Sequence, residues 1–178
     1  MKEKKLVIFI DSGDTLVDES TEIRKVPDGV VYEAQFIPGA EETLLELKKR
    51  GYPLVLVADG LKESFDRIYE SRFLESPFRA RAISEIVGER KPSPKMFQTA
   101  MDLMKLGPEE KSRIIMVGNN LARDIAGANR FGIRSVLMAW SPRYSMTPKT
   151  EEEQPDYRIE KPEELLELAE KIEQEISQ

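Results

Sequence analysis

The 178-residue chain contains neither cysteine nor histidine. Without cysteine it can form no disulfide or thiolate zinc site, and it offers no thiol nucleophile. Without histidine it has no Ser-His-Asp triad, no imidazole base and no imidazole metal ligand. Any catalysis must therefore use carboxylates, hydroxyls, lysine, arginine or a hard metal ion.

Long apolar runs and an excess of positive charge are missing too. The apolar run after the first lysines covers only residues 6–10, which is too short for the core of a signal peptide. No stretch reaches the roughly 20 apolar residues of a membrane span. The net charge is −6 and no basic stripe offsets it, so nothing favours nucleic-acid binding. We expect a cytoplasmic protein without nucleic-acid or membrane partners.

The residues that are present describe a globular α/β protein. With 40% apolar and 34% charged residues, the composition is ordinary, and the length suits one domain over residues 1–178. Continuous apolar runs predict buried strands at residues 6–10, 54–57, 114–117 and 135–139, with weaker candidates at 81–84 and 157–159. Helical patterns occupy residues 40–49, 94–106, 122–131 and 162–176. This alternation predicts a three-layer α/β/α sandwich around a mostly parallel, Rossmann-like sheet.

Polar residues gather where these strands end. Asp11 directly follows the first strand and begins a turn that contains Gly13, Asp124 lies shortly after the strand at 114–117, and Lys91 precedes the helix at 94–106. Because ligands bind at the carboxyl ends of parallel strands, we expect these three charged groups to converge. Two carboxylates, a lysine and a turn with free N–H groups suit a magnesium ion and a phosphoryl group.

Four segments, in order, resemble the motifs of the haloacid dehalogenase-like hydrolase superfamily. They are DSGDTL (residues 11–16), VADG (57–60), KPSPKMF (91–97) and VGNNLARDIAGA (117–128). Any one of them alone is a weak signal, but their order and spacing match over essentially the whole chain. The chain therefore resembles this superfamily, which implies the fold predicted above.

The resemblance also implies roles for individual residues. Asp11 would attack phosphorus and form an aspartyl-phosphate that water hydrolyses, and Lys91 would neutralise Asp11 and the transferring oxygens. Mg²⁺ would be held by Asp11, the backbone carbonyl of Gly13, and Asp124. The substrate would be bound at Ala58, Asp59, Gly60 and Asn119. The weaker alternatives are that Asp11 and Asp124 are helix N-caps and that Lys91 is an ordinary surface lysine.

Three positions depart from the superfamily pattern. The usual first motif has a second aspartate, which protonates the leaving group, where this chain has Gly13; the nearest acid, Asp14, is one residue further on. A general acid typically contributes ~10²–10⁴-fold, and alkyl phosphates depend on it most. Ala58 replaces a hydroxyl residue, losing a hydrogen bond worth about 1.5–3 kcal/mol. Asn119 replaces an acid, so it either binds metal or water, or orients a neighbour, and Asp124 is the only acid of that loop.

The segment available for a cap is short. Residues 17–37 are too few for a helical cap, and the alternation over residues 30–36 predicts a small β-flap in its place. Residues 61–90 are fully used by a helix, a connection and a strand. Without a lid, a bulky substrate or a second copy of the chain is needed to exclude water from the site. On the flap, Arg24, Lys25 and Tyr32 either contact substrate or are solvated.

These observations favour one function and keep two others open. The first is a magnesium-dependent phosphatase acting on a bulky or activated phosphorylated substrate, which includes a macromolecular one. The second is a catalytically weakened member of the superfamily that serves binding or regulation, motivated by Gly13, Ala58 and Asn119. The third, haloacid dehalogenation, ranks lower because it needs the closed apolar pocket that a helical cap provides.

Overall fold

The computed structural model, which describes residues 3–24 and 28–178, is built around a six-stranded parallel sheet. The strand order is β5-β4-β1-β6-β7-β8, so β1 lies between β4 and β6 near the centre. The strands are β1 (Val7–Ile10), β4 (Leu54–Ala58), β5 (Ala80–Ile83), β6 (Ile114–Gly118), β7 (Arg134–Met138) and β8 (Tyr157–Ile159). Because all six are parallel, their carboxyl ends lie along one edge, where the site residues are expected.

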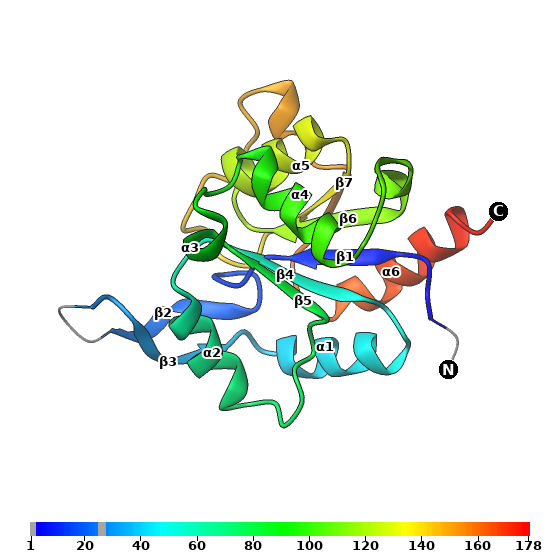
Figure 1. The fold of residues 1–178 in the computed structure, drawn as a ribbon. Helices are drawn as coiled ribbons and strands as arrows, with labels where there is room; N and C mark the ends of the chain where they lie inside the picture. Colours follow the sequence, from blue (N-terminus) through cyan, green and yellow to red (C-terminus); the bar gives the residue numbers. More distant parts are fainter. Residues whose placement is uncertain (1–2, 25–27) are drawn as a thin grey trace.

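Helices cover both faces of the sheet, which confirms the predicted three-layer sandwich (Figure 1). The α-helices are α1 (Ala40–Lys49), α2 (Lys62–Glu70), α3 (Ser84–Val87), α4 (Pro94–Leu103), α5 (Ala126–Phe131) and α6 (Glu164–Glu175). Strand side chains alternate between two cores: Ile8 and Ile10 pack in the core beneath α1, α2 and α6, whereas Val7 and Phe9 pack in the core beneath α4 and α5. The side chains of β1 thus point alternately to the two faces of the sheet. All four are apolar because the strand is buried on both faces.

The segment between β1 and α1 folds as the predicted flap, an antiparallel hairpin of β2 (Val17–Arg24) and β3 (Val31–Phe36). Figure 1 shows it projecting at the opposite end of the molecule from the two termini. The hairpin packs on α2, where the backbone N–H of Val31 donates to Ser64 Oγ at 2.9 Å. The hairpin is therefore held, through α2, near the carboxyl edge of the sheet. Lys25 lies outside the described residues.

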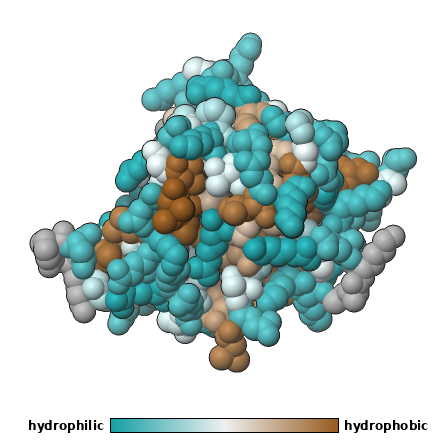
Figure 2. Space-filling view, in the orientation of Figure 1, coloured by the Kyte–Doolittle hydropathy of each residue, from teal (hydrophilic) through white to brown (hydrophobic). Residues whose placement is uncertain are grey.

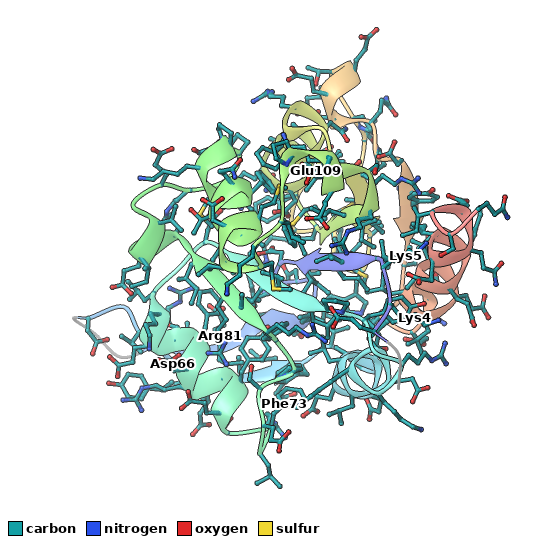
Figure 3. The ribbon with its side chains drawn as sticks, turned by 45° about the vertical axis from the view of Figure 1, so that its right-hand side comes forward. Lys4, Lys5, Asp66, Phe73, Arg81 and Glu109 are labelled. Carbon is teal, nitrogen blue, oxygen red and sulfur yellow. The ribbon has the colours of Figure 1, made fainter. Side chains whose placement is uncertain are left out.

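An ion pair fixes α2 on the edge of the sheet. Arg81 on β5 lies 3.0 Å from Asp66 on α2, measured from Nη1 to Oδ1. Figure 3 shows both side chains between these two elements. Because α2 also carries Ser64, this contact helps to set the position of the hairpin relative to the strands.

The helices differ from the predicted ones at two places. The helix expected over residues 94–106 ends at Leu103, because Lys105 takes a positive φ of 57° that no right-handed helix accepts. The helix expected over 122–131 is divided into one π-helical turn, η2 (Leu121–Ile125), and α5. Two short 3-10 helices, η1 (Pro108–Arg113) and η3 (Glu151–Glu153), complete the described structure. The predicted strand bounds agree with the observed ones to within one residue at each end.

One face of the molecule can be followed in a space-filling view (Figure 2). The face in Figure 2 shows hydrophilic side chains interrupted by small, separate apolar patches. In the described part of the chain, no helix is long and apolar enough to cross a bilayer.

Candidate active site

Asp11, Lys91 and Asp124 come together at the carboxyl edge of the sheet. Lys91 Nζ lies 2.8 Å from Asp11 Oδ1 and 2.7 Å from Asp124 Oδ1, so one ammonium group joins the two carboxylates. Lys91 is 3% exposed and the Asp11 side chain 14% exposed. The convergence expected from the strand ends is therefore present in the structure.

The structure does not support the alternative roles of these residues, which were helix N-caps for Asp11 and Asp124 and a surface position for Lys91. The side chain that caps η2 is Asn120, whose Oδ1 accepts from the backbone N–H of Arg123 at 3.0 Å, so Asp124 is not the cap. Asp11 precedes a turn and β2, and no helix begins there. Lys91 is buried and paired rather than a surface lysine.

Backbone contacts hold the Asp11 and Lys91 side chains in place. The backbone N–H of Asp11 donates to the carbonyl of Val117 at 2.9 Å, which extends the β1–β6 pairing by one residue. Lys91 Nζ also donates to the carbonyl of Val57 at 2.8 Å, and its backbone N–H donates to Asp59 Oδ1 at 3.0 Å. Three neighbouring strands, β1, β4 and β6, thus position the two groups.

Asp124 is held by the π-helical turn and by a glycine at the end of β6. Its Oδ2 accepts from the backbone N–H of Asn120 at 3.0 Å. A Cβ atom on Gly118 would lie 2.3 Å from the same oxygen, so the carboxylate occupies the space that any side chain there would need. Single π-helical turns are frequent at functional sites, and here the turn carries the buried acid.

The electrostatics of the site leave it short of positive charge. Burial, together with the nearby Asp124 carboxylate, raises the pKa of Asp11 to about 7 although Lys91 opposes the shift. Burial disfavours the charged form of Lys91, but the carboxylates of Asp11 and Asp124 outweigh it and raise the lysine pKa above its usual value. One ammonium group therefore balances the buried carboxylate of Asp124 and the partly buried carboxylate of Asp11, and a further cation would stabilise their ionised forms.

The donor set fits a magnesium ion. The described residues contain no group of three or more acidic, histidine or cysteine side chains that could hold a metal. Magnesium, however, is usually bound through one or two carboxylates with waters and substrate oxygens. Asp11 and Asp124 supply two such carboxylates, and Asp124 Oδ1, although close to Lys91, makes no hydrogen bond of good geometry.

The charged groups border a cavity of about 580 Å³. Its walls come from the loop after β1, the hairpin, the start of α2, the segment before α4 and the loop after β6. Of the residues expected to bind substrate, Asp59, Gly60 and Asn119 line the cavity. Asn119 is 2% exposed and its Nδ2 has no hydrogen-bond partner, so an amide donor is available there.

Two of the expected contact residues lie elsewhere. Ala58 is 1% exposed and packs in the core, because β4 continues through it and turns its methyl group away from the cavity. Tyr32 is not part of the cavity lining, whereas Arg24 is. Arg67 lies over the ring of Tyr32 at 4.2 Å from its centroid, which places this tyrosine against α2.

The sequence did not indicate a second charged cluster beside the cavity, formed by Asp14, Glu19 and Arg143. Asp14 is fully buried, pairs with Arg143 Nε, and its Oδ1 accepts from the backbone N–H of Glu19 at 3.0 Å. It does not line the cavity, so it does not take the place of the missing first-motif acid. Glu19 does line the cavity, and burial, followed by the charges of Asp14 and Glu22, raises its pKa.

Comparison with known proteins places the chain in a family. Residues 8–138 match the family of haloacid dehalogenase-like hydrolases. The chain is 33% identical over 139 residues to glyceraldehyde 3-phosphate phosphatase of Methanopyrus kandleri, a match that covers 76% of this chain and 57% of that protein. This chain thus spans little more than half the length of that relative.

Solved structures show the same fold. A HAD phosphatase from Thermococcus onnurineus is 19% identical with a TM-score of 0.72, covering 92% of this chain and 97% of that one. A HAD hydrolase from Bacillus subtilis, solved bound to magnesium, is 24% identical with a TM-score of 0.65, covering 76% of this chain and 56% of that one. Together with the sequence match over most of its length, this likeness shows that the chain belongs to the haloacid dehalogenase-like hydrolases.

Proposed function

We propose that this protein is a magnesium-dependent phosphatase that works through an aspartyl-phosphate on Asp11. The observation that carries the proposal is the meeting of Asp11, Asp124 and Lys91 beside an open cavity. The family match and the relative from Methanopyrus, itself named as a phosphatase, support the reaction class.

The residues divide the reaction between them. A carboxylate oxygen of Asp11 attacks phosphorus and the leaving oxygen departs; water then attacks the aspartyl-phosphate and releases phosphate. Lys91 holds the Asp11 carboxylate in place at 2.8 Å and balances the charge of the transferring oxygens. A magnesium ion held by Asp11, the Gly13 carbonyl and Asp124 would add positive charge at the phosphoryl group.

The cavity supports an organic phosphate rather than a small anion as substrate. Its volume of about 580 Å³ lies within the range typical of small-molecule sites. Besides Lys91, the described cationic residues Arg24, Arg90 and Arg123 line the cavity, in reach of further polar groups on a substrate. The bulky substrate expected from the sequence stays part of this proposal. Such a substrate, or a second copy of the chain over the opening, would also exclude water.

Turnover of a phosphate ester panel with and without Mg²⁺ tests this function. We expect hydrolysis only with the metal, and a mass gain of one phosphoryl group after incubation with acetyl phosphate. Asp11→Asn removes the nucleophile while keeping its size, so both signals should fall to background. Asp102→Asn, an exposed aspartate on α4, is the matched control and should retain both signals.

The outcome separates catalysis from binding. Activity that survives Asp11→Asn in purified protein would place the chemistry elsewhere. Wild-type protein that shows neither turnover nor a phosphoryl adduct would contradict the proposal and favour a binding or regulatory role for the fold.

A further inference from the structure

The carboxyl group of Glu19 occupies the space beside Gly13. A Cβ atom built on Gly13 would lie 1.9 Å from Glu19 Oε1 and 2.7 Å from its Cδ. Glu19 comes from β2, and both residues line the cavity next to Asp11. A carboxyl group is therefore present where a side chain of residue 13 would begin, although residue 13 itself has none.

Arg143, whose Nε pairs closely with Asp14, also lies near this carboxyl group. Glu19 Oε2 lies 3.5 Å from Arg143 Nε, while Oε1 is the oxygen over Gly13. The Glu19 side chain is 31% exposed, so it is partly buried yet open to the cavity. One carboxylate oxygen of Glu19 thus lies near the guanidinium group, and the other lies beside Gly13 in the loop that carries Asp11.

The other acids around the cavity are engaged by different partners. Four further acidic side chains line it besides those bound to Lys91 Nζ. Glu22 pairs with Arg24 at 2.6 Å, Glu85 accepts from the backbone N–H of Lys62 at 2.7 Å, Glu89 contacts Ser93 and Lys95, and Asp59 accepts from the backbone N–H of Lys91 at 3.0 Å. Glu19 is the acid that lies directly against the loop carrying Asp11.

We propose that Glu19 is the general acid and base of the reaction, taking the place of the side chain that Gly13 lacks; this rests on the phosphatase function proposed above. As Asp11 bonds to phosphorus and the P–O bond to the leaving group breaks, the leaving oxygen takes the proton of Glu19 and departs as an alcohol. Glu19, now a carboxylate, accepts a proton from the water that attacks the aspartyl-phosphate. The acid is regenerated, and phosphate and the Asp11 carboxylate are released.

This assignment names a substrate class. An alkoxide leaves badly unless it is protonated, so a site without an acid would be restricted to activated esters. With Glu19 in this role, ordinary alkyl phosphate monoesters are substrates, and the restriction to activated leaving groups that Gly13 suggested is removed.

Leaving-group dependence tests the proposal. Glu19→Gln keeps the size of the side chain and removes the transferable proton. We expect kcat/KM for glycerol 3-phosphate to fall roughly 10²–10⁴-fold and kcat/KM for p-nitrophenyl phosphate to fall far less, because a good leaving group gains little from protonation. Glu33→Gln, an exposed glutamate on β3 of the same hairpin, should change neither value.

Moving the acid provides the second test. Gly13→Asp alone forces a new side chain into the Glu19 carboxyl group, so it should impair activity on both esters. The double variant Gly13→Asp with Glu19→Ala clears that space and supplies a carboxyl group from the loop. We expect it to recover glycerol 3-phosphate hydrolysis relative to Glu19→Ala, with thermal melts confirming that each variant is folded.

Each result decides the assignment. Equal losses on both esters in folded Glu19→Gln, or no loss on either, would overturn the role of Glu19 while leaving the phosphatase function standing. A wild-type protein active on p-nitrophenyl phosphate but inert on every alkyl ester would also overturn it. A wild-type protein inert on all esters overturns the proposed function and this assignment with it.

Discussion

Two sides of the cavity use carboxylates in different ways. On one side, Asp11 and Asp124 share the buried ammonium group of Lys91. Asp11 directly follows β1, Asp124 lies on the turn after β6, and Lys91 lies just before α4. On the other side, Gly13 has no side chain, and a carboxyl group reaches the same loop from Glu19 on the hairpin, 3.5 Å from Arg143. The first side depends on the sheet, whereas the second depends on an attached element and on a long loop.

Because the two groups of residues differ in burial, we expect them to contribute differently to stability and to catalysis. The Lys91 side is buried and fixed by backbone contacts from three strands, so damage there should lower both stability and activity. The Glu19 side is partly exposed, so a change there should alter substrate preference while the sheet stays intact.

The largest effect is expected from Lys91→Met, which removes the ammonium group shared by Asp11 and Asp124. The change keeps a long apolar stem but leaves the buried carboxylate of Asp124 and the partly buried one of Asp11 without their cation, and breaking a buried ion pair costs about 3–5 kcal/mol. We expect loss of turnover and a melting temperature lower by on the order of 10 °C. Mg²⁺ should raise the melting temperature of this variant more than that of the wild type, because it restores positive charge.

Lys95→Met is the control for that variant. Lys95 lies on the neighbouring helix α4, its side chain is 55% exposed, and its nearest acid, Glu89, is 3.9 Å away. Its loss should change stability by less than about 0.5 kcal/mol. A Lys91→Met protein as stable as this control would show that the two carboxylates do not need the lysine.

A smaller effect is expected from Gly118→Ala, which displaces one carboxylate without removing it. The new methyl group would lie 2.3 Å from Asp124 Oδ2 and 2.5 Å from Asp124 Cβ, so the acid must move. We expect the Mg²⁺ concentration for half-maximal activity to rise about 10–100-fold, the range seen when support of a metal ligand is lost.

Gly107→Ala is the matched control for Gly118→Ala. A Cβ there also meets a carboxylate, 2.4 Å from Glu109 Oε1. That carboxylate is the end of an exposed surface side chain and can turn away. The metal requirement should stay at the wild-type value, and a rise in both variants would mean that the effect is not local to Asp124.

The smallest effect is expected from Arg143→Ala, which removes the cation that pairs with Asp14 and lies near Glu19. Asp14 is fully buried, and without Arg143 its carboxylate keeps only the backbone N–H of Glu19 at 3.0 Å. We expect the free energy of unfolding to fall by about 1–3 kcal/mol in urea titrations. In an Asp14→Asn background the same change should cost less, because a neutral amide needs no guanidinium partner. Equal losses in both backgrounds would rule out this coupling.

The sequence predicted the positions of Asp11 and Asp124 well, because local sequence patterns indicate where buried strands end. An apolar run followed by Asp11, and another followed by Gly118 and the loop to Asp124, place both acids on one edge once the sheet is parallel. Lys91 precedes a helix and does not directly follow a strand, so the order of the four motifs added support for its place; its separation of 80 residues from Asp11 along the chain carries no geometric information by itself.

The positions of Glu19 and Arg143 beside Gly13 could not be predicted, for two physical reasons. The β2–β3 pairing shifts register between Asp18 and Ile23, so simple alternation along the strand does not give the side on which Glu19 lies. Arg143 comes from the loop after β7, 129 residues from Asp14, and no periodic pattern leads to it. Gly13 was the usable signal, because a missing side chain in a functional turn leaves space for another residue.

The strand order also has a consequence for folding. Lys91 reaches Asp11 and Asp124 only after β1 has paired with both β4 and β6, and parallel strands pair through long chain segments that close slowly. No isolated hairpin or helix pair contains the three groups. Recovery of turnover during refolding would therefore follow the pairing of β1 with β4 and β6, and the onset of activity would time that step.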